Sequence, residues 1–269
     1  MSAALPASAQ PIITLDRVSK SFGGGQGFAV REVSVAIAPG ELVAIVGASG
    51  SGKTTLLKTI NRLVDIDSGV VAVSGEQVDR VPAHELRRRI GYVFQGLGLF
   101  PHMSVAENIG ITPRLLGWPR AQIVARIEEL VDLVALPRSF LERMPAALSG
   151  GQQQRVAVAR ALAARPAIML MDEPFGALDP VTRDTLGTDY RRLHEAIGLT
   201  TLMVTHDVLE AVLLADRIIV VRGGQIVADG APRALLMDHP DAGVRALMAM
   251  PWRQSERVRA VVEERDARG

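Results

Sequence analysis

The sequence predicts an α/β domain built around a central sheet, and three observations support that fold class. Segments typical of buried strands, such as 42–46 and 168–172, alternate with helical patterns along most of the chain, as in sheets covered by helices. A glycine-rich loop at 47–54 separates one of these strands from a helix. A helix-only stretch from about 97 to 160 interrupts the alternation, and we expect it to form a helical subdomain.

Four further strands are expected in the first third of the chain. Residues 12–18 and 29–37 read as two strands joined by a glycine-rich turn at 23–27. Residues 70–75 form a short β-branched run, and residues 90–94 form an apolar one. Both are predicted to be strands.

Beyond residue 100 the pattern first becomes helical and then returns to strands. Ser104 and Glu107 make a capping box at a helix start. Residues 120–136 carry apolar side chains at the spacing of one buried helical stripe. A strand is expected at 200–206, and 217–230 reads as a hairpin that turns at two glycines.

Composition places the chain among ordinary globular proteins. Its 269 residues are 48% hydrophobic and 22% charged, enough for one large domain with a small appendage. We assign the domain to 12–235 and leave 236–269 as a tail with room for one amphipathic helix. The first 11 residues lack a secretory pattern, and we expect a short disordered lead-in.

Charge and cysteine content exclude several functions. The chain has no Cys, which removes disulfides, thiolate metal sites and a Cys nucleophile, and fits a reducing cytoplasm. A net charge of +1 does not favour a nucleic-acid partner, because nucleic-acid-binding domains usually carry a clustered basic excess. No apolar run of 18 residues occurs, so no transmembrane segment is expected.

Residues 47–54 match the phosphate-binding pattern GxxxxGK[ST] between a predicted strand and a helix expected at about 53–63. The glycines let backbone N–H groups close around phosphates, Lys53 reaches the β- and γ-phosphates, and the Thr54 hydroxyl ligates Mg²⁺. The predicted nucleotide contacts in this loop are Gly47, Ala48, Ser49, Gly50, Ser51, Gly52, Lys53, Thr54 and Thr55.

Five other candidate side chains lie at the ends of predicted strands or just beyond them. Asp172 ends an apolar strand and is a candidate Mg²⁺ ligand, and the adjacent Glu173 is a candidate base for an attacking water. His206 and Gln95 close two other strands, where an open α/β sheet binds its ligands; Gln95 could hold Mg²⁺ or the water. Phe22 stands between a strand and a glycine turn, where stacking on a purine and core packing remain equally open.

The octapeptide LSGGQQQR at 148–155 places a Ser and two Gly directly before a predicted helix. Such a helix N-terminus offers unpaired N–H groups and a partial positive charge to an anion. The chain therefore carries a second candidate phosphate-binding element.

Taken together, these stretches resemble the ATP-binding-cassette (ABC) ATPases over residues 12–235. The elements follow the order of that family: aromatic A-loop, Walker A, Q-loop, LSGGQ, Walker B, D-loop and H-loop. In this sequence they are Phe22, 47–55, Gln95, 148–155, 168–174, 177–179 and His206. The resemblance implies a phosphate-loop NTPase fold with an antiparallel β subdomain and a helical subdomain. Ala48 and Phe22 replace the more common Pro and Tyr, with little expected effect.

The resemblance also implies a head-to-tail homodimer that sandwiches two ATP molecules with Mg²⁺. The LSGGQ motif of one subunit would face the partner's Lys53, and Asp179 would link the two sites. Glu173 would polarise the attacking water, and His206 would contact the γ-phosphate. The residues expected to meet the partner's nucleotide are Ser149, Gly150, Gly151 and Gln152.

Residues 92–118 and 171–183 are most similar to ATPase subunits of importers for quaternary ammonium osmoprotectants such as glycine betaine, carnitine and choline. Importers of amino acids and other small solutes have similar sequences in these segments and remain an alternative. The resemblance implies two transmembrane permease subunits, an extracytoplasmic substrate-binding protein and a place on the cytoplasmic face of the plasma membrane. Some members of this branch also carry regulatory CBS modules after the cassette; only about 35 residues follow it here, and we do not expect regulation by such modules.

Three rival functions use related cassettes. Repair and chromosome ATPases with a coiled-coil arm insert it between Walker A and LSGGQ, yet Ser149 lies only 96 positions beyond Lys53. Ribosome-associated factors place two cassettes in one chain, and no second GxxxxGK[ST] pattern occurs. An exporter subunit is harder to exclude.

Overall fold

The computed structural model describes residues 10–23, 27–237 and 239–266, and its centre is a six-stranded sheet. The β10 strand pairs antiparallel with β9, and every other neighbouring pair in this sheet is parallel. In order across the sheet the strands are β10 (Gln225–Gly230), β9 (Arg217–Arg222), β3 (Leu42–Val46), β8 (Thr200–Val204), β7 (Ile168–Asp172) and β6 (Ile90–Val93).

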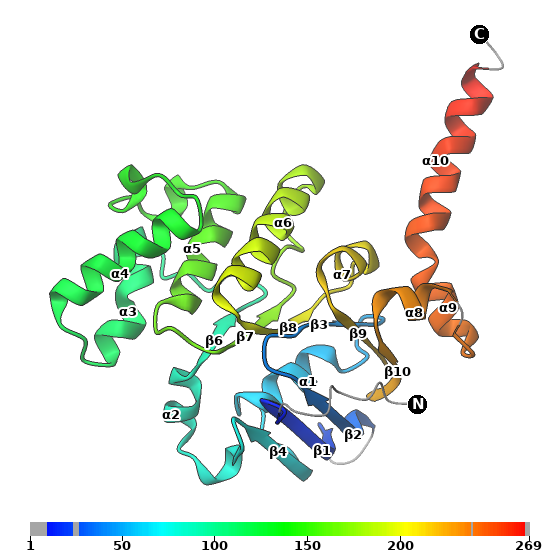
Figure 1. Ribbon diagram of the computed structural model, residues 1–269, viewed down its shortest axis with the longest axis horizontal. Helices are drawn as coiled ribbons and strands as arrows, with labels where there is room; N and C mark the ends of the chain where they lie inside the picture. Colours follow the sequence, from blue (N-terminus) through cyan, green and yellow to red (C-terminus); the bar gives the residue numbers. More distant parts are fainter. Residues whose placement is uncertain (1–9, 24–26, 238, 267–269) are drawn as a thin grey trace.

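A second, antiparallel sheet lies below the first in Figure 1. Its order is β2 (Phe28–Ile37), β1 (Ile13–Ser21), β4 (Ser68–Val73) and β5 (Glu76–Gln77). The strands predicted at 12–18, 29–37 and 70–75 are thereby confirmed. Residues 24–26 of the predicted glycine turn and residues 1–9 of the predicted lead-in lie outside the described residues.

Ten α-helices and three short 3₁₀ turns complete the described chain. Serine and aspartate caps begin several helices, and Ser104 and Glu107 form the predicted capping box. The apolar stripe predicted at 120–136 becomes the buried face of a helix. The helix predicted at 53–63 is shorter, because its last turn loosens after Ile60. The helices are α1 (Lys53–Ile60), α2 (Ala83–Arg88), α3 (Val105–Leu115), α4 (Arg120–Leu133), α5 (Gly150–Leu162), α6 (Pro180–Ile197), α7 (Val208–Leu214), α8 (Pro232–Met237), α9 (Ala242–Met248) and α10 (Met250–Asp266); the turns are η1 (Val78–Arg80), η2 (Arg138–Phe140) and η3 (Pro145–Ala147).

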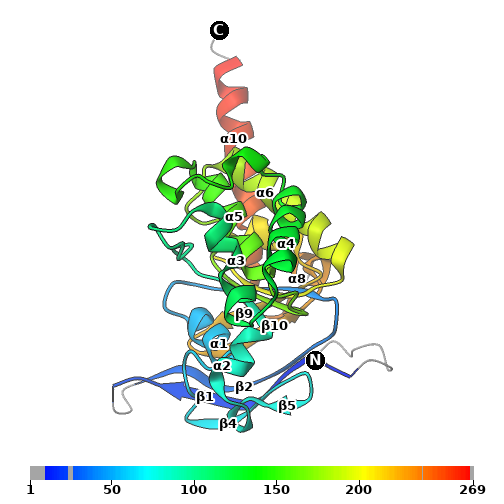
Figure 2. The same cartoon turned by 90° about the vertical axis from the view of Figure 1, so that its left-hand side faces the viewer.

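The central sheet separates two hydrophobic cores. Alternate side chains of β3 point to opposite faces, as the pleat requires: Leu42 and Val46 join one core, and Val43 and Ile45 join the other. The first core holds α3 to α7, and the second holds α1 and the antiparallel sheet. Figures 1 and 2 show α1 on the opposite side of the sheet from α5 and α6.

The C-terminal helices differ from the single tail helix that the sequence suggested. Asp241 caps α9, accepting from the N–H of Val244 at 3.0 Å. Val244 and Met248 are buried in the first core, so packing against the domain continues past residue 235. From there α10 extends away from the body (Figure 1). Among the described residues, no helix is long and apolar enough to cross a membrane.

Candidate nucleotide site

The glycine-rich loop at 47–52 connects the carboxyl end of β3 to the N-terminus of α1. Gly47 and Gly52 have positive φ angles of 149° and 102°, which favour glycine. A Cβ on Gly52 would overlap the carbonyl oxygen of Ala29, so the loop also needs glycine to pack against β2. Gly52 is the N-cap of α1 and supplies no side-chain cap. The first N–H groups of α1 are therefore left for an anion.

Lys53 is the first residue of α1, and its side chain folds back over the loop. Its Nζ donates to the carbonyl oxygens of Gly47 and Ala48, both at 2.8 Å. Burial lowers the pKa of Lys53, while the nearby carboxylates of Glu173 and Asp172 oppose that shift. An ammonium group with few water contacts interacts strongly with a phosphate.

Thr54 and Asp172 come together from α1 and from the end of β7. The Thr54 hydroxyl donates to Asp172 Oδ1 at 2.8 Å, and Lys58 Nζ lies 4.0 Å from Oδ2. Burial raises the pKa of Asp172, and the Thr54 hydrogen bond and Lys58 partly offset this. A hydroxyl and a carboxylate beside the phosphate-binding loop are oxygen donors of the kind Mg²⁺ prefers, so the residues fit that ion.

Glu173 occupies an unusual backbone conformation directly after β7. Its φ is 49°, a left-handed value that is uncommon outside glycine and often found at functional sites. The Glu173 N–H donates to the Val204 carbonyl of β8 at 2.9 Å. The strand pairing thus holds the residue while the chain turns away from the sheet.

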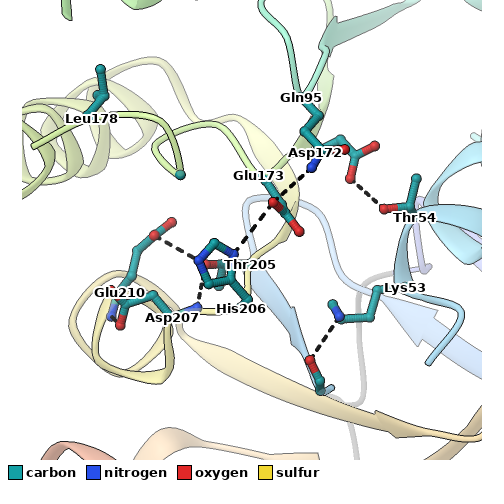
Figure 3. Close-up of polar contacts among 12 residues, drawn as sticks. Lys53, Thr54, Gln95, Asp172, Glu173, Leu178, Thr205, His206, Asp207 and Glu210 are labelled. Atoms are coloured by element: carbon teal, nitrogen blue, oxygen red, sulfur yellow. Dashed lines mark hydrogen bonds and ion pairs between the residues drawn. The ribbon is translucent and has the colours of Figure 1, made fainter. Parts of the chain in front are cut away.

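Three side chains that are far apart in the sequence meet at this turn (Figure 3). Gln95 Nε2 donates to Glu173 Oε2 at 3.0 Å, and His206 Nδ1 lies 3.5 Å from the same oxygen. Gln95 follows β6 and His206 follows β8. The structure therefore brings together the three residues that the sequence placed at strand ends.

The loop that carries His206 is held by residues that the sequence analysis did not select. The Asp207 N–H donates to Thr205 Oγ1 at 3.0 Å, and Thr205 Oγ1 donates to Glu210 Oε2 at 3.2 Å. Asp207 also caps α7, accepting from the N–H groups of Leu209 and Glu210. An Asp just before an apolar helical run is a cap signal that could have identified Asp207. Nothing in the pattern identified Glu210.

The LSGGQ motif forms the predicted helix start at α5. Ser149 Oγ accepts from the Gln152 N–H at 3.3 Å, and Gln152 Oε1 accepts from the Ser149 N–H at 3.0 Å. This capping box leaves the N–H groups of Gly150 and Gly151 without an intrahelical partner. A Cβ on Gly151 would press on Thr182 of α6 at 2.7 Å, so glycine also allows close packing there.

Two predicted nucleotide contacts lie outside this centre. Asp179 is the N-cap of α6, with Oδ1 accepting from the Thr182 N–H at 3.0 Å. Phe22 is 56% exposed, so the core-packing alternative is wrong and the ring is free to stack. Phe28 on the paired strand is 52% exposed, and the sequence analysis missed it. The backbone of this hairpin end touches the phosphate-binding loop through Ala29 and Gly52.

A parallel sheet with a glycine-rich phosphate loop, an adjacent hydroxyl–carboxylate pair and a second glycine-capped helix defines a phosphate-loop nucleotide-binding domain. The family model described as ABC transporter matches residues 30–176, more than half of the chain. The chain belongs to the ABC transporter family. The predicted family and fold class are therefore confirmed.

Three relatives show the range of transporters to which the chain is similar. The choline transport ATP-binding protein OpuBA of Bacillus subtilis is 47% identical, and the match covers 86% of this chain and 60% of OpuBA. The glycine betaine uptake system ATP-binding protein YehX of Escherichia coli is 49% identical over 84% of this chain and 72% of YehX. The sulfate/thiosulfate import protein CysA of Thermosynechococcus vestitus is 48% identical over 85% and 66%. The chain thus spans about 60% of the length of OpuBA.

A solved structure supports the same family. The dimeric ATP-binding cassette MJ0796, in a post-hydrolysis state bound to ADP and Pi, superimposes with a TM-score of 0.73 at 34% identity. The match covers 81% of this chain and 98% of MJ0796. The similarity therefore extends over the whole of that cassette.

The buried carboxyl of Glu210 predicts a pH-dependent stability. Burial raises its pKa from 4.5 to about 7; Asp207 and Glu173 add to the shift, and Thr205 and Arg183 oppose it. The folded state then binds a proton that the unfolded chain releases, so stability falls as pH rises from about 4.5 to 7 and stays low above.

Glu210→Gln should remove this loss, because an amide does not ionise, and its oxygen can still accept from Thr205. The difference in unfolding free energy between variant and wild type should grow by up to about 3 kcal/mol between pH 4.5 and 8. Urea denaturation at each pH measures it. Glu195→Gln on the exposed side of α6 is the control. If the difference in unfolding free energy between Glu210→Gln and wild type did not change with pH, the raised pKa of the buried Glu210 would be contradicted.

Proposed function

We propose that the chain is the ATP-hydrolysing subunit of an ABC importer. The observation that carries this proposal is the convergence of Gln95, Glu173 and His206 beside the phosphate-binding loop. Glu173 directly follows Asp172, and its Oε2 lies within 3.5 Å of the side chains of Gln95 and His206. This is the arrangement that a base needs beside a metal-bound triphosphate.

Each side chain has a defined part in that reaction. Lys53 and the N–H groups of the loop at 47–55 bind the β- and γ-phosphates. Thr54 and Asp172 would hold Mg²⁺, and Gln95, which contacts Glu173, would bind the ion or the attacking water. The ion neutralises charge on the phosphates when bound. Glu173 accepts the proton of the attacking water, while His206 contacts the γ-phosphate and stays oriented by Glu173. The exposed ring of Phe22 stacks on the purine.

The working form is a head-to-tail homodimer. The N-terminus of α5 and the phosphate-binding loop belong to helices on opposite sides of the central sheet (Figure 1), so one chain presents two separate half-sites. The free N–H groups of Gly150 and Gly151, with Ser149 and Gln152, bind the γ-phosphate held by the partner subunit. Asp179 connects the two sites. The dimeric state of MJ0796 with ADP and Pi supports the proposal of a dimer.

A groove of about 310 Å³ receives a membrane partner. Its exposed apolar side chains come from the segment after β6 and from α3, and include Phe94, Phe100 and Leu115. In the dimer, each ATPase subunit would bind a cytoplasmic helix of one of the two permease subunits in this groove, next to Gln95. Closure of the dimer on ATP then moves the groove. This places the chain on the cytoplasmic face of the plasma membrane, where a substrate-binding protein on the other side delivers the solute.

The solute that we propose is a quaternary ammonium osmoprotectant such as glycine betaine, choline or carnitine. The similarity to OpuBA and YehX supports this assignment. The sequence identity to CysA, 48%, is about the same as the identity to OpuBA and YehX. An importer for another small solute is therefore the second candidate.

Glu173→Gln should slow ATP hydrolysis by at least about 10²-fold, because the amide cannot accept the proton of the attacking water. The variant should also accumulate as an ATP-bound dimer in gel filtration. Glu76→Gln, which alters an exposed ion pair with Arg89, serves as the control. Near-wild-type turnover in Glu173→Gln would remove this residue from its role.

The head-to-tail dimer predicts complementation between two inactive chains. Lys53→Ala removes a phosphate contact in its own loop, and Ser149→Arg blocks the half-site offered to a partner. A mixed dimer should contain one intact site, whereas each variant alone contains none. We expect ATP-dependent dimerisation, followed by light scattering, to return on mixing. Its absence at every mixing ratio would argue against the composite site.

Transport is tested with the complete complex in proteoliposomes. With its permease subunits and binding protein, the chain should drive ATP-dependent uptake of radiolabelled glycine betaine, and Glu173→Gln should abolish it. Leu115→Asp in the groove should reduce co-purification of the permease, because a charge opposes burial of that face. Val124→Asp, exposed on α4 outside the groove, should not. Uptake of sulfate in place of glycine betaine would select the second candidate.

A further inference from the structure

The segment before Asp179 and the loop that carries His206 are joined by one side chain, Arg183. It lies in the first turn of α6. Its Nη1 donates to Asp207 Oδ2 at 3.0 Å, and its Nη2 donates to the Leu178 carbonyl at 3.0 Å and, more weakly, to the Gly176 carbonyl at 3.4 Å. One guanidinium therefore contacts both segments.

One segment lies near the imidazole of His206, and the other continues directly from the His206 backbone. On one side, Gly176 is so close that a Cβ added there would stand 3.5 Å from His206 Cε1. On the other side, Asp207 follows His206 and is itself fixed by its contacts with Thr205 and with the N-terminus of α7. The two segments that Arg183 joins thus adjoin His206, one at its ring and one through its backbone, while the side chain itself stays 56% exposed.

We propose that Arg183 is a positioning residue that holds His206 toward Glu173 and couples its orientation to the segment 176–179. The proposal rests on the proposed function, in which His206 contacts the γ-phosphate and Asp179 meets the partner subunit. Dimer contacts at Asp179 then reach His206 through Arg183 and Asp207. Hydrolysis is thereby linked to a properly closed dimer.

The geometry requires an arginine. The fork of a guanidinium binds a carboxylate with one N–H group while another binds backbone carbonyls, and the ammonium of lysine is a single point with rotatable donors. The Asp207 carboxylate and the Leu178 carbonyl are held by different nitrogens of Arg183. A lysine at this position would reach one partner at the expense of the other.

The first test follows the His206 ring in the nucleotide-free chain by ¹H–¹³C NMR of the imidazole C–H groups, assigned with His206→Gln. We expect Arg183→Gln to move and broaden the His206 signal. Arg191→Gln is the matched control, because Arg191 lies farther along the same helix and pairs with Glu195 and Asp216. An unmoved His206 signal in Arg183→Gln overturns the proposal whether or not the chain hydrolyses ATP.

The second test separates chemistry from binding. Arg183→Gln should lower kcat by about tenfold or more, because small displacements of a catalytic group cost rate. KM for ATP should change by less than about twofold, since the phosphate loop is untouched. Equal losses in the control variant overturn the proposal. Arg183→Lys keeps the positive charge and guards against misfolding. A wild-type His206 signal in Arg183→Lys would overturn the requirement for the forked guanidinium group.

Discussion

The site depends on the register between β7 and β8. Asp172 lies opposite Val204, and the Glu173 N–H extends the ladder by one more bond to the Val204 carbonyl. This bond holds a residue whose φ of 49° would otherwise be costly. The result is that two neighbouring acids serve different purposes: Asp172 stays buried against Thr54, while Glu173 turns toward Gln95 and His206. A slip of one residue would exchange the two faces.

Much of this arrangement could be predicted from local patterns. Apolar runs identified β3, β7 and β8, and a parallel sheet brings the carboxyl ends of such strands to one edge, so the meeting of Gln95, Glu173 and His206 followed from the fold. Helix caps at Ser104 and Ser149 were equally local. The strands and caps depend on neighbours within a few residues in the sequence, and the meeting of the three side chains follows once those strands lie parallel in one sheet.

The features that the sequence did not reveal depend on tertiary contacts. Arg183 and Glu210 look like ordinary polar residues of a helix. Arg183 gains its partner Asp207 only when α6 packs beside the start of α7, and Glu210 becomes buried against Thr205 only in the folded domain. The exposure of Phe22 was undecided because a strand end can face either water or a core. Burial of Val244 in the first core was missed for another reason: the apolar residues of the tail follow too weak a period to predict its docking.

The two half-sites that we propose follow from how α5 begins. Its capping box satisfies the N–H groups of Ser149 and Gln152 within the chain, so the helix start is stable without a ligand. The N–H groups of Gly150 and Gly151 remain for an anion, but α5 packs on the face of the sheet away from α1. Lys53 meanwhile is desolvated among its own loop carbonyls and needs an anion for the same electrostatic reason. In the proposed dimer, a triphosphate between two copies would supply one anion to both positive elements, which would be a physical reason for nucleotide binding and dimer closure to occur together.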